Sequence, residues 1–521
     1  MKVLSIGIDG GDPVLINRWM KRLPNFQLLM KKGVSGNCRS TKPAISAPAW
    51  VSFATGKNPG KTGIVGFIQR QKGSYETYTV SSLNVNEPVF WEIAGDLGKK
   101  VLVMNVPITY PPKQVNGVLI SGFPSPVSLE TFPEELSPEL KKKGYKVDLE
   151  IGPRPDFKRL KEDLIKLINL RVTTFVQLVR RIDPELAVIV FTAADRMQDL
   201  FYSRTDEDKE VESAIFDIYK GIDDAVGSLL RLNEDGLTFI NSDHGACKVK
   251  RQFNVNDWLI EKGFLKLKKN KISIISKLMI CLGMTVQGPW YQLINSLGMA
   301  GKLKELLPQR LVRKIPWETL PNFENLEIDW GKTVAYSYGN QNLIYLNIAG
   351  REPLGIVKKE EEAVMRKRII REMKKLVDPE IKIKIWEKEQ LYQGKFLREM
   401  PEIIFEISEN SCCPVSSVGH GRFFSASELR HGDHSPEGIF YAYGPNIKAG
   451  IKRDCEITDL APTILYSLGI SVSHNLDGKI LWDIFSEKKG KKLRPVPLKI
   501  KKGIRDTLRA KINRLKLKGK I

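Results

Sequence analysis

The chain has 521 residues, of which 42% are hydrophobic and 27% charged. This composition is typical of a soluble globular protein and excludes a disordered or fibrous one, and the length allows one large domain or two to three ordinary ones. The first ten residues form a short apolar run that ends in an acid, without the charged start, longer apolar stretch and cleavage site of a signal peptide. Six cysteines show no CxxC and no zinc-finger spacing. We therefore expect a cytoplasmic protein with reduced thiols.

The net charge of +22 is concentrated near the carboxyl end. Between residues 488 and 520 there are 15 Lys and Arg and one acid, Asp506, so this tail carries +14 and the rest of the chain +8. Apolar residues recur among these cations at near-helical spacing: Ile504, Leu508, Ile512 and Leu515. A basic amphipathic helix suits an anionic membrane surface, while nucleic acid or plain solvent are alternatives. We expect peripheral contact with the inner face of the membrane.

Three segments share one pattern, an apolar β-branched run that leads to an acid. They are Val3–Ile8 before Asp9, Ala187–Thr192 before Asp195, and Leu237–Ser242 before Asp243. Such runs suit strands that are buried on both faces of a parallel sheet, and helical patterns such as Glu162–Ile182 lie between them. The alternation predicts an α/β fold with a doubly wound, mostly parallel sheet. Because ligands bind at the carboxyl ends of such strands, we expect the three acids to converge on one site.

Two further strands are predicted at Lys100–Met104 and Gly438–Tyr443. The first leads to Asn105, at the same edge of the sheet as the acids. The second is followed by a helical pattern with Thr458 as its N-cap and Gly469 just beyond its carboxyl end.

The stretch from about 265 to 400 interrupts the alternation of strands and helices, and it includes a charged helical pattern at Lys358–Leu376. We expect it to form an inserted cap region. Within it, residues 278–301 contain no charged side chain, but Gln287, Gly288 and Pro289 interrupt the run, so we do not expect a membrane span. It is either a wall of the cap or a surface that rests on lipid. The predicted catalytic domain has two parts, residues 1–265 and 401–487. Residues 266–400 form the inserted cap, and residues 488–521 form the basic tail.

Asp243, His244 and Gly245 follow the third acid-terminated strand, and Asp9 follows the first. Carboxylates and imidazole are ligands of divalent cations. An Asp-His pair on its own is more often part of a surface loop, but its expected convergence with Asp9 favours a metal site.

Asp195 and Asp199 are spaced so that both carboxylates lie on one face of a helix. Acids also favour the first turn of a helix, so a solvated helix start is the alternative. A bound cation would relieve the repulsion between the two carboxylates, and this favours the interpretation as ligands.

Ser46 lies just ahead of a short helix predicted over Pro48–Thr55. A serine in this position commonly caps the helix. It can also be a nucleophile, because a phosphate that it attacks would lie against the free N–H groups and the positive end of the helix dipole. Spacing alone does not decide between these two roles.

Several segments occur in a fixed order: IDG at 8–10, PAISAPAWVSFATGKNPGKTGI at 43–64, TAADRMQDLFY at 192–202, SDHG at 242–245, HGDHSPEGIFYAYGPNI at 431–447 and DLAPTILYSLGI at 459–470. Together they resemble the type I phosphodiesterase/nucleotide pyrophosphatase family of the alkaline phosphatase superfamily, from Met1 to about Trp482. The resemblance implies an alkaline phosphatase-like fold and metal-dependent hydrolysis of phosphate diesters or monoesters. It also implies two divalent metal ions, Ser46 as nucleophile and a phosphoseryl intermediate.

The resemblance implies the ligands as well. One metal would be held by Asp9, Ser46, Asp243 and His244, and the other by Asp195, Asp199 and His434. The family usually has histidine where this chain has Asp199, so the second site is richer in oxygen, and Mn²⁺ or Mg²⁺ competes with Zn²⁺ there. The N–H after Ser46, together with Asn105, is expected to bind a non-bridging phosphate oxygen.

Other functions remain open on the same fold. A phosphomutase or phosphotransferase would pass the phosphoryl group to a hydroxyl, and a non-catalytic, membrane-associated binding module would use the scaffold without turnover. A sulfatase is disfavoured because the residues after Ser46 include the proline but not the arginine of that motif. The expected substrate is a phosphate ester, either a nucleotide or a lipid-linked or otherwise anionic diester, rather than nucleic acid.

Overall fold

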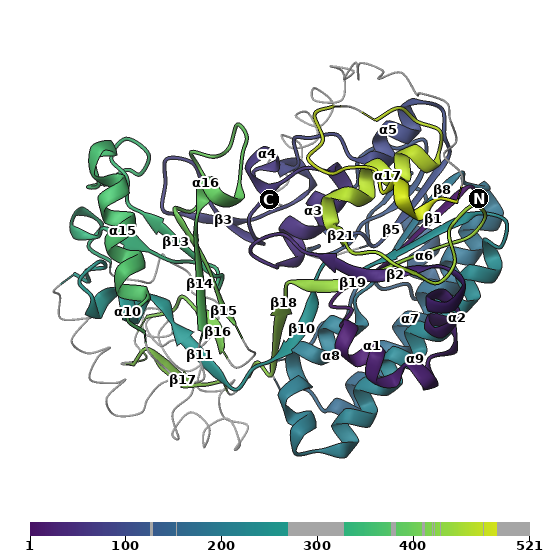
Figure 1. Cartoon of the computed structure of the whole chain (residues 1–521), viewed down its shortest axis with the longest axis horizontal. Helices are drawn as coiled ribbons and strands as arrows, with labels where there is room; N and C mark the ends of the chain where they lie inside the picture. Colours follow the sequence, from purple (N-terminus) through teal and green to yellow (C-terminus); the bar gives the residue numbers. More distant parts are fainter. Residues whose placement is uncertain are drawn as a thin grey trace.

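The computed structural model describes residues 1–125, 129–152, 154–268, 328–376, 382–408, 412–418, 420, 422–427, 429–472 and 474–486. Within these residues, a ten-stranded sheet forms the centre of the larger part of the molecule (Figure 1). Its order is β20-β2-β19-β9-β1-β8-β5-β6-β7, and β21 also pairs with β2. The strands are β1 (Val3–Ile8), β2 (Val34–Arg39), β5 (Val101–Met104), β6 (Gly117–Ile120), β7 (Thr131–Phe132), β8 (Leu186–Phe191), β9 (Leu237–Asn241), β19 (Glu437–Tyr443), β20 (Ile451–Lys452) and β21 (Cys455–Glu456).

The middle of this sheet is parallel, as the apolar runs predict. β1 pairs in parallel with both β8 and β9, and β5 pairs in parallel with β6 and β8. All residues of β1 and β8 are buried, which is the pattern of strands covered on both faces. β19 is antiparallel to its neighbours β9 and β2. The predicted doubly wound, mostly parallel sheet is therefore confirmed.

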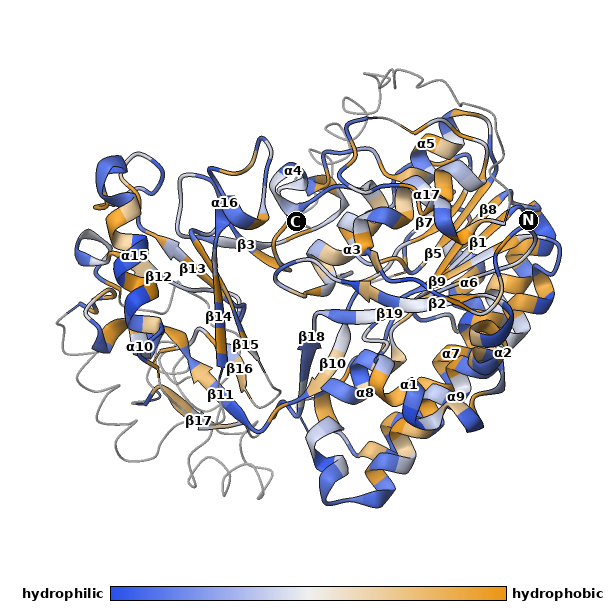
Figure 2. Ribbon diagram, viewed as in Figure 1, coloured by the Kyte–Doolittle hydropathy of each residue, from blue (hydrophilic) through white to orange (hydrophobic). Residues whose placement is uncertain are grey.

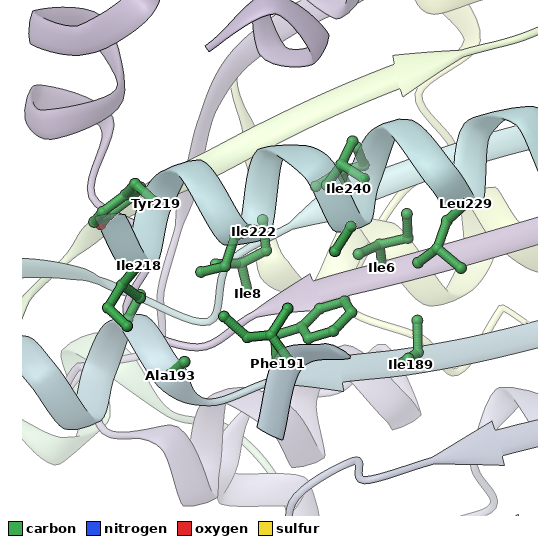
Figure 3. Packing of buried hydrophobic residues seen from close by; sticks show 14 of the residues in the cluster. Ile6, Ile8, Ile189, Phe191, Ala193, Ile218, Tyr219, Ile222, Leu229 and Ile240 are labelled. Carbon is green, nitrogen blue, oxygen red and sulfur yellow. The ribbon is translucent and has the colours of Figure 1, made fainter. Parts of the chain in front are cut away.

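Helices cover both faces of the sheet. One face packs against α1 (Pro13–Trp19), α2 (Pro24–Lys32), α7 (Phe157–Ile182), α8 (Ala193–Phe201) and α9 (Lys209–Leu232), and the other against α3 (Ser46–Thr55), α5 (Phe90–Asp96) and α17 (Leu460–Ser467). In Figure 3, Ile6 and Ile8 of β1 lie against Ile222 and Leu229 of α9. Figure 2 shows hydrophobic residues gathered in the central strands and hydrophilic residues on the outer faces of the helices.

Two predicted helix ends differ from the structure. α7 begins at Phe157 rather than Glu162, because the Asp156 side chain accepts a hydrogen bond from the Arg159 N–H and caps it. α17 has Asp459 as its N-cap, and Thr458 lies in the preceding 3₁₀ turn, so that prediction is wrong. Gly469 follows the C-cap of α17 with a φ of +77°, as predicted for a residue beyond the helix end.

The smaller part of the molecule is the cap, seen on the left of Figure 1. Its sheets have the orders β12-β13-β15-β14 and β16-β11-β17. The strands are β11 (Arg251–Asn254), β12 (Ala335–Tyr336), β13 (Leu343–Leu346), β14 (Lys382–Glu387), β15 (Ile403–Ser408), β16 (Cys412–Val415) and β17 (Phe424–Ala426), with α10 (Val255–Glu261) and α15 (Glu362–Met373) packed on them. The predicted charged helix is present as α15, after a 3₁₀ turn at Lys359–Glu361.

The pairing of these strands does not follow the predicted domain boundaries at 265/266 and 400/401. β11 lies before the predicted cap, and β15, β16 and β17 lie after it. All four hydrogen-bond within the cap sheets, because their partners are β13, β14 or one another. The cap is therefore assembled from more of the chain than residues 266–400.

Residues 278–301 and the tail at 488–521 lie outside the described residues. Among the helices that the structure describes, none combines the length and the apolar character needed to cross a membrane.

A buried charge network holds the cap sheet to its loops. Glu402 is fully buried, with Oε1 2.6 Å from Arg351 Nη1 and 2.8 Å from Lys388 Nζ. Burial acts to raise the pKa of Glu402, but the charges of Arg351 and Lys388 outweigh it and hold this pKa below its ordinary value. The network therefore depends on Glu402 remaining ionised.

Candidate active site

Three acids lie at the carboxyl ends of three neighbouring parallel strands. Asp9 follows β1, Asp243 lies just beyond β9, and Asp195 lies in the first turn of α8, directly after β8. Asp9 and Asp243 are fully buried and Asp195 nearly so. The Asp195 N–H donates to the Asp9 carbonyl at 3.2 Å, which joins two of these strand ends. The three acids therefore converge at one edge of the sheet, as predicted.

Asp9, Asp243 and His244 form a first group, whose ligand atoms all lie within 4.8 Å of one another. Asp9 Oδ2 accepts a hydrogen bond from Trp50 Nε1 at 3.0 Å, and Asp243 Oδ1 accepts one from the Gly10 N–H at 3.2 Å. Burial, and then repulsion by Asp243, raise the pKa of Asp9 well above its ordinary value. Burial also raises the pKa of Asp243 to about 6. These carboxylates lack the counter-charge that would stabilise them.

Asp195, His244 and His434 form a second group within the same limit, so His244 belongs to both. His434 Nε2 lies 3.6 Å from Asp195 Oδ1. The rings of His244 and His434 are stacked, with centroids 3.8 Å apart and planes at 19°. Burial and the neighbouring His244 lower the pKa of His434 well below its ordinary value, so His434 is neutral near pH 7.

Backbone carbonyls orient both imidazoles. His244 Nδ1 lies 2.9 Å from the Gly245 carbonyl oxygen, and His434 Nδ1 lies 2.9 Å from that of Ala44. Because a carbonyl oxygen only accepts, each Nδ1 carries the proton, and in the neutral ring Nε2 carries the lone pair. A hydrogen bond from one ring nitrogen to a backbone carbonyl typically fixes the orientation of a histidine whose other nitrogen binds a metal.

His244 Nε2 lies close to a carboxylate oxygen of Asp243. Asp243 Oδ2 is 3.2 Å from this nitrogen, is buried, and forms no hydrogen bond with any of the described residues. Two acceptors at this distance repel each other unless a cation or a proton lies between them. The donor set therefore fits a divalent cation.

Ser46 does not cap a helix. α3 begins at Ser46 itself, two residues before the predicted Pro48, and Ile45 is the N-cap. The Ser46 hydroxyl lies 3.0 Å from His244 Nε2 and 3.4 Å from Asp9 Oδ1. The side chain thus faces the first group of candidate ligands rather than the backbone of its own helix, and the capping role is excluded.

Asp199 reaches only the edge of the second group. Its Oδ1 lies 4.0 Å from His434 Nε2 and 3.5 Å from Arg430 Nη2. Arg430 also pairs with Asp433 Oδ1 at 2.9 Å. Burial raises the pKa of Asp199 to about 6, although Arg430 opposes this shift. The predicted set of Asp195, Asp199 and His434 is brought together, but both carboxylates also pair with an arginine, Asp199 with Arg430 and Asp195 with Arg196.

A cleft of about 380 Å³ adjoins these groups. Ser46, Asp195, Asp199 and His434 line its catalytic side. Its other side is formed by cap residues: Gly339, Asn340, Gln341, Asn342, Glu406 and Pro414. Phe67, Phe123, Arg196 and Arg430 lie along its margin. The cap therefore forms one side of the cleft that adjoins Ser46.

Asn105 is not among the residues that line this cleft. The Tyr145 hydroxyl donates to Asn105 Oδ1, and Asn105 Nδ2 donates to the Val147 carbonyl at 3.4 Å. The amide ties the loop at Tyr145 to the end of β5, so the geometry does not support the predicted contact between Asn105 and a phosphate.

Sequence reasoning missed two residues of the site, Trp50 and Arg430. Trp50 could have been found, because it lies one helical turn beyond Ser46 and therefore on the same face of α3. Arg430 has no comparable signal, since it reaches Asp199 only through the tertiary fold.

Comparisons with known proteins bear on the family and the fold of this chain. A model of the type I phosphodiesterase/nucleotide pyrophosphatase family matches residues 3–437. A comparison with curated protein sequences gave no match. Murine ectonucleotide pyrophosphatase/phosphodiesterase 5 is similar in structure, with a TM-score of 0.52, 13% identity, and coverage of 93% of this chain and 100% of that one.

A bacterial structure shares the fold as well. Phosphonoacetate hydrolase from Sinorhizobium meliloti 1021, in complex with phosphonoformate, has a TM-score of 0.54 and 14% identity, with 90% of this chain and 95% of that one covered. The murine protein is also known as an inactive variant in complex with AMP, again with a TM-score of 0.52 and 13% identity. At such identities, these likenesses establish the common fold.

Proposed function

This chain belongs to the type I phosphodiesterase/nucleotide pyrophosphatase family, whose members are phosphoric ester hydrolases, and on that premise we propose that it hydrolyses phosphate diesters with Ser46 as nucleophile. The observation that carries the proposal is the position of the Ser46 hydroxyl. Ser46 is the first residue of α3. Its hydroxyl lies within hydrogen-bonding distance of His244 Nε2 and beside the buried carboxylate of Asp9.

The residues present fit two divalent cations. Asp9, Asp243 and His244 would hold one, and Asp195 and His434, with Asp199 at the edge, would hold the other. When bound, such cations lower the pKa of a serine hydroxyl and neutralise the charge that develops on the leaving oxygen. Carboxylate oxygens outnumber imidazole nitrogens in this donor set, which favours Mn²⁺ or Mg²⁺ as competitors of Zn²⁺.

The chain's own residues then position the reaction. Ser46 Oγ attacks phosphorus and forms a P–O bond while the bond to the leaving oxygen breaks. The serine proton goes to solvent, and the leaving alkoxide takes up a proton. Ala47 lies in the first turn of α3, where the backbone N–H groups have no intrahelical partners. Its N–H can therefore donate a hydrogen bond to a phosphate oxygen. Water then cleaves the phosphoseryl ester and restores the hydroxyl.

The charges around the cleft favour a diester over a monoester. Among the described lining residues, both arginines are already paired: Arg196 with Asp148 and Asp195, and Arg430 with Asp199 and Asp433. A monoester dianion needs additional cationic contacts with its terminal oxygens. A diester carries a single negative charge and a second ester group, for which the cleft has room.

The test compares bis-p-nitrophenyl phosphate with p-nitrophenyl phosphate, in the presence of Mn²⁺, Zn²⁺ and Mg²⁺ in turn. We expect the diester to have the higher kcat/KM with at least one ion, and Ser46→Ala to abolish turnover without lowering Tm. An absence of turnover with every ion, together with no effect of Ser46→Ala, would leave the chain as a non-catalytic binding module.

The basic tail suggests where this hydrolase works. We propose that residues 488–521 bring the protein to an anionic membrane surface on the cytoplasmic side, because the segment carries most of the net charge. Flotation with vesicles containing phosphatidylglycerol tests this, with the full chain compared with a chain that ends at residue 487. Equal binding of the two would reject a role for the tail.

A further inference from the structure

Gln198 lies on α8 between two candidate metal ligands, Asp195 and Asp199. It is only 2% exposed and is not among the described residues that line the cleft. Both ends of its carboxamide are hydrogen-bonded: Nε2 donates to the Gly10 carbonyl at 2.8 Å, and Oε1 accepts from the Tyr219 hydroxyl at 2.7 Å. This buried side chain therefore joins the helix that carries two candidate ligands to the end of β1.

The peptide of Gly10 is the point at which three ligand-bearing segments meet. Gly10 directly follows Asp9, and its N–H donates to Asp243 Oδ1 at 3.2 Å. It has a φ of +66°, and a Cβ built on it would lie 3.0 Å from both Cα and Cβ of Asp195. The first turn of α8 thus packs directly on this peptide. Any displacement of α8 is therefore passed on to Asp9 and Asp243.

Tyr219 holds the Gln198 amide from the side of α9. Figure 3 shows this fully buried tyrosine on α9, near the end of β1 that Ile8 marks. Its hydroxyl donates to Gln198 and accepts from the Asp12 N–H at 2.9 Å. Burial raises the pKa of Tyr219 well above its ordinary value, so the hydroxyl keeps its proton. Tyr202, just beyond α8, donates to Asp12 Oδ2 at 2.7 Å, so two helices hold the segment that follows β1.

Apolar packing alone would already attach α8 to the sheet. Its buried face includes Ala193, Met197 and Phe201. Such contacts are non-directional, so they hold a helix in place without fixing its exact height or rotation. Hydrogen bonds have defined lengths and angles, and a fully paired buried network selects one arrangement. The carboxamide of Gln198 therefore supplies what the apolar face does not, which is a fixed position of α8 relative to Gly10.

We propose that Gln198 is a positioning residue, which sets the spacing between Asp9 at the end of β1 and Asp195 at the start of α8 through the Gly10 carbonyl. Tyr219 supports it by holding the carboxamide in the orientation that Gly10 requires. Neither residue touches the substrate. The proposal rests on the proposed metal-dependent hydrolysis, because this spacing affects catalysis only if the carboxylates hold cations.

The experiment measures Mn²⁺ binding separately from turnover, with the full-length protein. Gln198→Met keeps the length of the side chain and removes both hydrogen bonds. We expect the metal-free variant to bind Mn²⁺ about tenfold more weakly in a calorimetric titration, the lower end of the range for contacts that orient metal ligands. At saturating Mn²⁺, kcat for bis-p-nitrophenyl phosphate should fall by about tenfold because the reacting groups are misplaced. KM should stay unchanged, since Gln198 does not line the cleft.

The matched control is Gln69→Met. Gln69 is also a buried glutamine, 7% exposed, and its Nε2 donates to the Gly63 carbonyl at 2.8 Å, so the same kind of contact is lost at a place that is not part of the candidate ligand groups. The control should lower the Tm of the metal-free protein as Gln198→Met does, and it should leave Mn²⁺ affinity and kcat unchanged. Equal Mn²⁺ affinities of the two variants would overturn the proposal.

Tyr219→Phe provides a second measurement if Gln198→Met does not fold. It removes one hydroxyl and keeps the buried ring. We expect Mn²⁺ binding to weaken by about fivefold, which corresponds to one hydrogen bond of about 1 kcal/mol. An affinity equal to that of the wild type would also count against the positioning role.

The outcomes separate this proposal from the proposed function. If the wild type binds Mn²⁺ but hydrolyses bis-p-nitrophenyl phosphate with no ion, the diesterase function fails, and the titrations still decide the role of Gln198. If the wild type hydrolyses the diester and Gln198→Met binds Mn²⁺ as tightly as Gln69→Met, the diesterase function stands and the positioning role is wrong.

Discussion

Trp50 Nε1 donates a hydrogen bond of 3.0 Å to Asp9 Oδ2, and it does so from the same helix that begins at Ser46. One element therefore carries both the candidate nucleophile and the residue that orients a carboxylate ligand. Because Trp50 is fully buried, this contact is shielded from water. The indole links the position of α3 to the geometry at the end of β1.

Trp50→Phe should weaken metal binding while leaving the fold intact. The change removes the hydrogen bond to Asp9 but keeps most of the buried ring, and loss of such a supporting contact typically costs 10- to 100-fold in affinity. Titration of metal-free protein with Mn²⁺, followed by calorimetry, measures this. The control is Trp258→Phe, since the indole N–H of Trp258 in the cap has no partner among the residues that the structure describes. Equal affinities of the two variants would contradict the role of Trp50.

Removal of metal should destabilise the protein. Asp9 and Asp243 lie together with raised pKa values, and Asp195, which is paired with Arg196, lies beside them. A cation at 100 times its Kd adds about 2.7 kcal/mol to the free energy of unfolding. Thermal unfolding with EDTA, and then with excess Mn²⁺ or Zn²⁺, checks this. We expect His434→Ala to reduce the rise in Tm that the metal ion causes. The control is His431→Ala, because the His431 ring contacts Ser203, and this variant should keep the full rise. A rise in Tm that is the same in both variants would exclude His434 as a ligand.

Arg430→Gln should strengthen the second metal site. Arg430 competes for the Asp199 carboxylate, so its removal leaves Asp199 free to turn towards His434 and takes one positive charge away from the site. We expect about tenfold tighter binding of the second ion, read from the stoichiometry and affinity of a Mn²⁺ titration. Arg422→Gln, an exposed arginine of the same segment, is the control. Unchanged or weaker binding of the second ion by Arg430→Gln would show that the ion pair between Arg430 and Asp199 does not lower the affinity of this site.

Asp199→His addresses the same position by a change of ligand. An imidazole in place of the carboxylate makes the second donor set richer in nitrogen, which favours Zn²⁺ over Mn²⁺ and Mg²⁺. Competition between Zn²⁺ and Mn²⁺, measured by elemental analysis of the dialysed protein, should shift towards Zn²⁺. If the ratio of bound ions does not change, Asp199 is not a ligand.

Acid should destabilise the cap through Glu402. The folded-state pKa of Glu402 lies below that of an unfolded glutamate, about 4.3, so its stabilisation is present above that pH and is lost as the pH falls through the folded-state pKa. Glu402→Gln breaks a buried ion pair and should cost about 3–5 kcal/mol at pH 7. It should also flatten the acid limb of a plot of unfolding free energy against pH. Glu139→Gln, which removes an ion pair at the surface, should change that limb much less.

The strands and the acids of the site were predictable because their signals are local. A run such as Val3–Ile8 is buried on both faces, and its apolar character alone marks a central parallel strand. Since ligands gather at the carboxyl ends of such strands, Asp9, Asp195 and Asp243 could be assigned to one site before the structure was known. His434 was assigned only through the resemblance to the family.

The wrong or incomplete predictions concern contacts between distant parts of the chain. Asn105 lies at the expected edge of the sheet, but Tyr145 and Val147 occupy its amide. Strand pairing crosses the predicted boundaries of the cap, because it depends on contacts between distant segments rather than on any break in local pattern.

The sequence by itself determined the class of fold, the strand ends that carry acids, and the residue types able to bind a cation. Only the tertiary structure decided how they are used. Ser46 faces His244, 198 positions away, instead of capping its own helix, and the Ala44 carbonyl orients His434 across 390 positions. Local patterns reflect burial and backbone geometry within a few residues. The direction of a lone pair, or the choice of Asp199 between His434 and Arg430, depends on atoms that the fold alone brings together.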